Sequence, residues 1–192
     1  MTTSQSHYIG TLSPEMTLLG LLYEVPGHGY DLHRKVVTDL GQVWHLSQSQ
    51  TYSILKRLEI RGEISMEEVL QEKLPPRQLL HITDLGRKRF LVWLDAPSGG
   101  STRAIRMEFV TRVYFLKMYL PEKLLLAFKR QRAEIETHIR RLETMYADLP
   151  AEQIYNRTSL NMRLKQLRLV LEWLDECQDY FRLDPTLETN ST

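Results

Sequence analysis

The 192-residue sequence contains only one cysteine, Cys177, so no disulfide can form within the chain. No stretch approaches the roughly 18 consecutive apolar residues that a membrane-spanning helix needs. The opening residues also lack the hydrophobic region of a secretory signal peptide. A single thiol without these segments is typical of a protein in a reducing compartment, and we expect a cytoplasmic location.

The sequence also lacks the local motifs that support most enzyme chemistry. It has no glycine-rich phosphate loop and no Gly-x-Ser-x-Gly nucleophile turn. The six histidines show no spacing typical of metal ligands. We therefore predict a protein that is not an enzyme, with no catalytic residue, no bound metal and no cofactor.

An excess of one charge sign is missing as well. The net charge is +1, and residues 1–95 contain 10 Lys and Arg against 11 Asp and Glu, a balance of −1. Most nucleic-acid-binding domains have a basic face. Any argument for a nucleic-acid partner must therefore rest on where the charges lie.

Proline, glycine and serine gather between Asp95 and Thr102 and indicate a connector between two parts of the chain. The predicted organisation is a flexible tail at 1–12, a first domain at 13–95, a connector at 96–103, a helical domain at 104–182 and a flexible tail at 183–192.

In the first domain, the best-defined helix follows Ser47. Ser47 and Gln50 have the spacing of a capping box, in which each side chain bonds to the other's backbone, and Gly62 ends the helix. Helical periodicity places Thr51, Ile54, Leu55 and Leu58 on one side. The opposite side presents Ser49, Tyr52, Ser53, Lys56 and Arg57.

Other segments around this helix complete a recognisable order. Helices are expected from Ser13 and from Tyr30, and strands at 64–69 and 78–82, with Pro75 and Pro76 in the turn between them. Thr83 is suited to cap a fourth helix. Helix, helix, helix, hairpin, helix is the order of a winged helix-turn-helix.

The second domain reads as all helical. Residues 107–120 are apolar nearly all round, and a long helix should run from Pro121 to about Leu149. The last helix has leucines at alternating spacings of four and three, which form a heptad seam that needs another helix to cover it. An antiparallel pair within the chain is one solution. Three helices carry more nonpolar surface than one small bundle conceals, however, so we predict a homodimer with this interface: Leu160, Leu164, Leu167, Leu171 and Leu174.

The fold class is therefore mainly α: an N-terminal winged helix-turn-helix with an α/β hairpin wing, followed by a C-terminal antiparallel helical dimerisation domain. Four segments resemble the PadR family of transcriptional regulators, in its larger form with a helical C-terminal domain. They are residues 29–32 (GYDL), 51–59 (TYSILKRLE) followed by Gly62, 75–87 (PPRQLLHITDLGR) and 108–116 (EFVTRVYFL). The sequence differs from the family pattern at Ser53, where proline is frequent, and at Leu80 and His81, where an aromatic residue is common.

The resemblance implies a repressor that binds inverted-repeat operators as a homodimer and, in some members, responds to a small aromatic or hydrophobic effector. Trp93, beside the connector, is the candidate ligand-binding residue. An alternative is a winged-helix protein-interaction module without DNA binding, which the neutral charge of the first domain leaves open. A recognition helix presents its exposed residues to base edges and phosphates, and a wing reaches the DNA backbone. The predicted DNA-binding residues are Ser49, Gln50, Tyr52, Ser53, Lys56, Arg57, Lys73 and Arg77.

Overall fold

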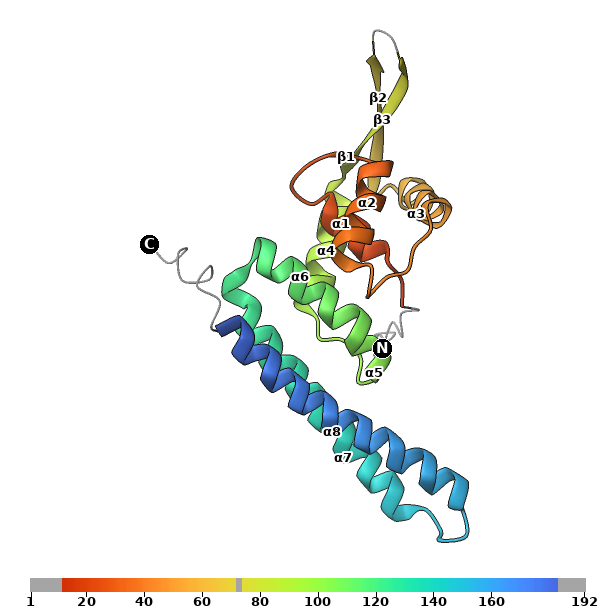
Figure 1. The fold of residues 1–192 in the computed structure, drawn as a ribbon, viewed down its shortest axis with the longest axis vertical. Helices are drawn as coiled ribbons and strands as arrows, with labels where there is room; N and C mark the ends of the chain where they lie inside the picture. Colours follow the sequence, from red (N-terminus) through yellow and green to blue (C-terminus); the bar gives the residue numbers. More distant parts are fainter. Residues whose placement is uncertain (1–11, 72–73, 183–192) are drawn as a thin grey trace, which may run out of the picture. The chain divides into compact units, whose positions relative to one another are not determined.

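The computed structural model describes residues 12–71 and 74–182 (Figure 1). The chain folds into two compact units, Met1–Ala96 and Pro97–Thr192, which are described separately. The predicted tails at 1–12 and 183–192 fall almost entirely outside the described residues, as does Lys73.

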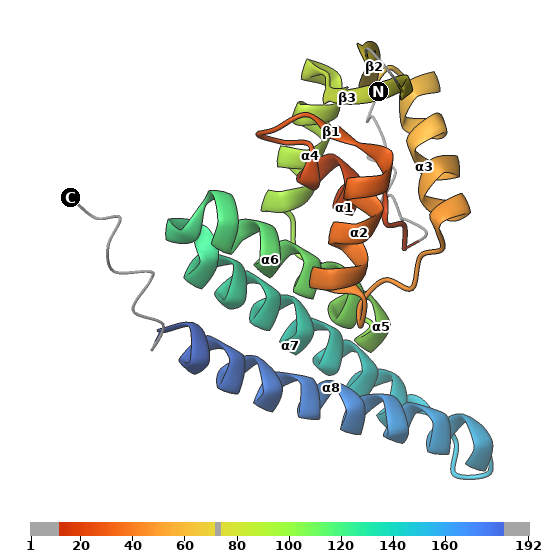
Figure 2. The same ribbon diagram turned by 45° about the horizontal axis from the view of Figure 1, so that its top comes forward.

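The described part of the N-terminal unit contains four helices, and side-chain caps fix the start of two of them. Ser47 accepts a hydrogen bond from the Gln50 backbone N–H at the start of α3, and Thr83 accepts one from Gly86 at the start of α4. Figure 2 shows α1, α2 and α3 grouped together in this unit. The four helices are α1 (Glu15–Leu21), α2 (Gly29–Leu40), α3 (Gln48–Ile60) and α4 (Asp84–Asp95).

A three-stranded antiparallel sheet completes this unit, with strand order β1-β3-β2. Its strands are β1 (Gly27–His28), β2 (Ile64–Gln71) and β3 (Leu74–Ile82). The β2–β3 hairpin forms a wing that extends beyond the helices (Figure 1). Gly62 makes the turn from α3 into β2 with a φ of 70°, a conformation that favours glycine.

The wing is longer than predicted, because residues expected in the turn belong to the strands. Pro75 and Pro76 lie inside β3. Proline has no backbone N–H to donate, so it is tolerated only where a strand has a free side. β1 pairs with β3 only at Leu79 and Leu80, so the proline segment has β2 as its single neighbour among the described strands. The two-residue β1 was not predicted, since so short a strand has no periodicity.

The core of the N-terminal unit lies where the four helices meet the base of the wing. The apolar side chains of this core are nearly inaccessible to solvent. The buried face of α3 is the one that helical periodicity predicted. The buried apolar residues include Leu18, Leu19, Leu22, Val36, Ile54, Leu55, Leu58, Ile64, Phe90 and Leu94.

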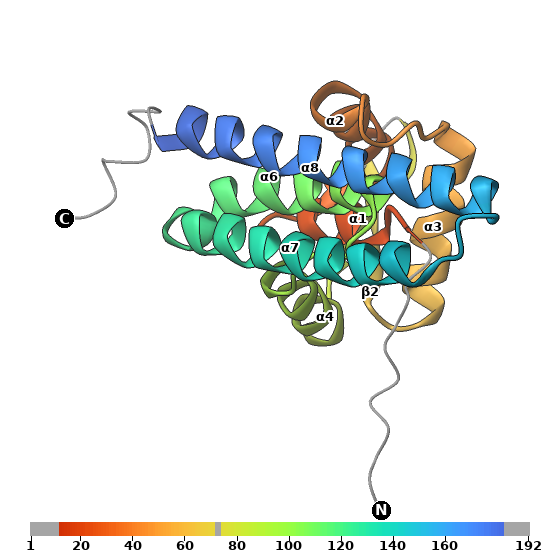
Figure 3. The same cartoon turned by 90° about the horizontal axis from the view of Figure 1, so that it is seen from below.

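All regular secondary structure in the described residues of the C-terminal unit is helical. A short helix, α5 (Thr102–Ala104), leads through a π-helical turn (Ile105–Phe109) into α6 (Val110–Tyr119). A 3₁₀ turn (Pro121–Lys123) then precedes the two long helices α7 (Leu124–Asp148) and α8 (Ile154–Arg182). Figures 1, 2 and 3 all show α7 and α8 side by side as an antiparallel hairpin.

The predicted leucine seam packs inside this hairpin. Leu160, Leu164, Leu167 and Leu174 are buried in the single chain, and Leu171 is half-buried. α7 supplies a matching stripe at Phe128, Ile135, Ile139 and Leu142. These contacts confirm a mainly helical fold in which a winged helix-turn-helix is followed by antiparallel helices. α7 covers the seam within the chain, and the role of these leucines as a dimer interface stays a prediction.

Candidate nucleic-acid interface

The start of α3 is fixed by the predicted capping box. The Gln50 N–H donates to Ser47 Oγ at 3.2 Å, and the Ser47 N–H donates to Gln50 Oε1 at 2.9 Å. Ser49 lies beside the cap, with its Oγ 3.0 Å from Ser47 Oγ. Gln50 is exposed, but its side-chain oxygen already serves as the cap. Its predicted role toward DNA therefore competes with a structural one.

The outer face of α3 lies in solvent while its inner face is locked to α2. Tyr52, Ser53 and Lys56 are exposed, as the helical periodicity predicted. Thr51 is fully buried, and its hydroxyl lies 3.1 Å from His33 Nδ1 on α2. This contact fixes which side of α3 faces outward.

Tyr52 lies against the backbone of Gly29, the first residue of α2. A Cβ atom added to Gly29 would lie 2.7 Å from Tyr52 Cε1, closer than such atoms approach one another. The Tyr52 side chain nevertheless remains 45% exposed. Sequence analysis placed Tyr52 on the exposed face but could not show that Gly29 is needed to accommodate it.

The root of the wing is fastened to the start of α2. His28 pairs with Leu79 through the β1–β3 ladder. Its Nδ1 donates a hydrogen bond to the Gln78 carbonyl oxygen at 2.8 Å. Arg77, the neighbouring residue on β3, is exposed. The wing and the α2 start are therefore connected by both backbone and side chain.

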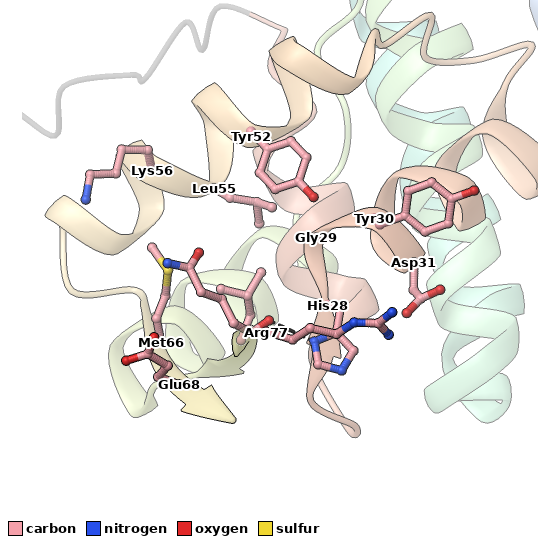
Figure 4. Close-up of a pocket in the computed structure, with 12 residues that line it drawn as sticks. His28, Gly29, Tyr30, Asp31, Tyr52, Leu55, Lys56, Met66, Glu68 and Arg77 are labelled. Carbon is pink, nitrogen blue, oxygen red and sulfur yellow. Dashed lines mark hydrogen bonds between the residues drawn. The ribbon is translucent and has the colours of Figure 1, made fainter. Parts of the chain in front are cut away.

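A cleft of about 820 Å³ lies between α3, the wing and the start of α2 (Figure 4). It brings together three of the predicted DNA-binding residues, Tyr52, Lys56 and Arg77. Asp31 and Glu68 also line it, so the charges in the cleft are mixed. Its other lining residues are His28, Gly29, Tyr30, Leu55, Met66, Gln78 and Leu80.

Two predicted phosphate-binding cations on α3 have different surroundings. Lys56 Nζ lies 2.7 Å from Glu59 Oε2 on its own helix, in an exposed pair. Arg57 Nε lies 3.6 Å from Glu15 Oε1, and that carboxylate is buried. Arg61, which sequence analysis did not select, contacts the same carboxylate at 2.8 Å. Arg57 of α3 and Arg61, the residue after its last turn, thus each place a nitrogen near this buried carboxylate while remaining partly exposed.

The surface of the C-terminal unit offers an apolar groove of about 390 Å³. Leu169 lies at this groove and is 64% exposed. The groove is formed by α5, the π-helical turn, α6 and α8, and is lined by Thr102, Ile105, Arg106, Val110, Gln166, Leu169, Val170 and Trp173. In the N-terminal unit, Trp93 is half-buried and stacks on Phe90 with ring centroids 6.0 Å apart. The predicted ligand-binding role of Trp93 stays a prediction.

Two features are absent from the residues that the structure describes. None of the helices there has the length and apolar character required to cross a bilayer. No group of three or more His, Cys, Asp or Glu side chains in those same residues is arranged to hold a metal ion.

Comparison with protein families decides the identity. The transcriptional regulator PadR-like family matches residues 18–91, which span α3 and the wing. The C-terminal region of the virulence activator alpha type matches residues 105–182. The chain belongs to the PadR-like family of transcriptional regulators. The predicted family and the prediction of a protein that is not an enzyme are thereby confirmed.

Individual relatives of this PadR-like chain include the negative transcriptional regulator PadR of Bacillus subtilis, which is 27% identical over 134 residues, covering 70% of this chain and 73% of that protein. A crystal structure of Bacillus subtilis PadR in complex with operator DNA matches with a TM-score of 0.44 and 22% identity, covering 87% of this chain and 98% of the other. A structure of the same protein with p-coumaric acid matches with a TM-score of 0.39 and 22% identity, covering 88% and 98%.

Proposed function

We propose that this PadR-like regulator represses transcription by binding a specific DNA duplex as a homodimer. The observation that carries the proposal is the capped, exposed face of α3 beside the wing, with Tyr52, Lys56 and Arg77 around one cleft. A recognition helix of this kind enters the major groove with its N-terminal residues toward base edges. The Bacillus subtilis relative is named a negative transcriptional regulator, which supports repression rather than activation.

The proposed contacts divide into two kinds. Ser49, Tyr52 and Ser53 lie on the first half of α3, where side chains reach bases and determine sequence preference. Lys56 on α3 and Arg77 on β3 are the proposed phosphate contacts. Lys73 remains a proposed wing contact outside the described residues.

Binding to upstream DNA tests this proposal directly. We would measure fluorescence anisotropy with the duplex upstream of the encoding gene and with a scrambled duplex, each at two salt concentrations. Specific binding should exceed scrambled binding at both, and both affinities should fall as salt rises. Binding that does not distinguish the two duplexes, or no binding at low salt, would contradict the proposal and favour a protein-interaction module.

Dimerisation would place two recognition helices about one DNA turn, roughly 34 Å, apart on an inverted repeat. Since α7 already covers the leucine seam, we propose the apolar groove around Leu169 as the dimer contact. Light scattering should show a dimer for the unchanged protein and a folded monomer for Leu169→Glu. A dimer that persists in Leu169→Glu would exclude this groove.

We also propose that a small aromatic or hydrophobic compound releases the protein from DNA. Bacillus subtilis PadR, whose structure with p-coumaric acid is named above, supports an aromatic acid as the first compound to test. Trp93 fluorescence in a variant with the other two tryptophans replaced by Phe should change on addition of an effector that weakens DNA binding. If compounds release DNA without changing that fluorescence, Trp93 is not the site.

A further inference from the structure

The N-terminal unit buries two carboxylates at the end of the recognition helix that lies away from the cap. Glu15 is the first residue of α1 and Glu63 directly precedes β2, and each is 6% exposed. Acidic side chains are rarely this buried unless cations accompany them, because removing a charge from water is costly.

Three arginines surround these carboxylates. Arg61 Nη2, from the end of α3, lies 2.8 Å from Glu15 Oε2 and 3.5 Å from Glu63 Oε2. Arg89 of α4 donates from Nη2 to Glu15 at 2.8 Å and from Nη1 to Glu63. Arg57 of α3 is the third, 3.6 Å from Glu15. The carboxylates therefore join α1, α3, α4 and the start of β2.

The pKa values of Glu15 and Arg89 agree with both side chains being charged. Burial by itself raises the pKa of Glu15, but hydrogen bonds and charge from Arg89 and Arg61 outweigh it and hold the pKa below its ordinary value. Burial likewise lowers the pKa of Arg89, while its bonds to Glu15 and Glu63 raise it overall. Glu15 and Arg89 therefore remain ionised at neutral pH.

Lys56, next to Arg57 in the sequence, is a natural comparison. The Lys56 side chain is 65% exposed and its partner Glu59 lies on the same exposed helix, so exchanging that partner for a phosphate costs little. Moving Arg61 to a phosphate would instead take a close counter-charge from the buried Glu15 carboxylate, which is unfavourable. Arg57 Nε lies 3.6 Å from the same carboxylate, so moving Arg57 costs less than moving Arg61.

We propose that Glu15 and Glu63 are positioning residues that withhold Arg57 and Arg61 from DNA. This inference rests on the proposed function. The held arginines fix the last turn of α3 against the unit and add no sequence-independent phosphate contacts. Such contacts strengthen binding to every sequence equally, so withholding them lowers affinity for all duplexes alike. The ratio of specific to non-specific affinity rises because the fixed turn of α3 holds the base-contacting residues in place.

The salt dependence of DNA binding distinguishes an arginine that stays paired with a carboxylate from a cation that contacts a DNA phosphate. The specific probe is a duplex that the protein enriches from a random-sequence pool, and the non-specific probe is its scrambled version. Each phosphate contact contributes about 0.9 to the slope of log affinity against log salt. Lys56→Ala should flatten the slope by about that amount, about 0.9. Arg57→Ala and Arg61→Ala should leave the slope unchanged and lower only the specific affinity.

Glu15→Gln is the complementary variant, because it keeps the size of the side chain and removes its charge. The released arginines should steepen the salt slope by about 0.9 for each new phosphate contact. Non-specific affinity should rise, and the ratio of specific to non-specific affinity should fall. Circular dichroism checks that Glu15→Gln is folded; if it is not, the exposed Arg57→Ala and Lys56→Ala pair decides the question without it.

The possible outcomes distinguish a failure of this inference from a failure of the proposed DNA-binding function. If no duplex is enriched and the unchanged protein binds no DNA at low salt, the proposed function and the inference fail together. If the unchanged protein binds its duplex but Arg57→Ala flattens the salt slope as much as Lys56→Ala, Arg57 touches phosphate and the inference alone is overturned. An unchanged slope in Arg57→Ala with a flatter one in Lys56→Ala supports it.

Discussion

Different kinds of contact stabilise the interior of each of the two units. The N-terminal unit depends on single polar contacts, such as the Ser47 cap and the buried Glu15, to place a short exposed helix. The C-terminal unit repeats one kind of apolar contact along two helices of 25 and 29 residues. The difference indicates that substitutions in the C-terminal seam act mainly on stability, while those on the exposed face of α3 act mainly on binding.

The largest effect is expected from Leu167→Ala in the seam. Leu167 is 3% exposed, and truncating a buried leucine costs about 2–5 kcal/mol through lost contacts and the cavity that remains. Urea unfolding of the full chain measures the change. Met162→Ala, exposed on the same helix and outside the proposed dimer groove, is the matched control and should change stability by about 0.5 kcal/mol or less. Equal losses for the two variants would contradict an intrachain seam.

The seam residue Leu167 also shows how far the sequence predicts the C-terminal unit. The heptad spacing identified the helix and its buried face, because apolar periodicity depends only on the chain's own residues. It did not identify the covering helix, since a stripe on α7 and a stripe on a partner subunit leave the same pattern in α8. The three-dimensional arrangement was needed to choose between them.

The next largest effect is expected from Gly29→Ala, which crowds the Tyr52 ring. Overpacking of this kind costs about 1–3 kcal/mol, and moving Tyr52 should also weaken specific DNA binding. Thermal unfolding and anisotropy measure the two effects. Gly99→Ala is the control, because its added Cβ makes only an ordinary contact at 3.9 Å with Ala104. If Gly29→Ala binds its duplex normally, Tyr52 does not need its observed position.

Removing the cap of α3 should have a moderate effect. Ser47→Ala loses the bond to the Gln50 N–H, which costs about 1 kcal/mol at a helix start. Chemical denaturation of the full chain reports it through the transition of the N-terminal unit. Ser53→Ala, on the exposed face of the same helix, should leave stability unchanged. A Ser47→Ala variant as stable as Ser53→Ala would show that the capping box is dispensable.

The smallest expected effect is the pH dependence of protein stability that Glu15 causes. Its pKa in the folded protein lies below the ordinary 4.5, so its stabilisation is complete above pH 4.5 and is lost as pH falls through the folded value. Only the upper part of this loss precedes general acid unfolding. The melting temperature of the unchanged protein should thus fall more steeply below pH 4.5 than that of Glu15→Gln. Parallel curves would contradict the depressed pKa.

The candidate site was predictable where its signals are local. Ser47 and Gln50 are three residues apart, so the cap of α3 and its exposed face follow from spacing alone. Glu15 and Arg89 are 74 residues apart, and in the sequence Glu15 has only the ordinary character of an acid in a first helical turn. The same limit applies to Gly29 and Tyr52, whose contact depends on how α2 crosses α3.

Thr83 has a consequence for how the wing can vary. Its hydroxyl donates to the Gly62 carbonyl at 2.7 Å while accepting from the Gly86 N–H, and its own N–H donates to the Glu63 carbonyl. These bonds close the base of the hairpin independently of its far end. Insertions or deletions beyond that base therefore change the reach of the wing without disturbing the helices. Among related chains, wing length can evolve separately from the rest of the domain.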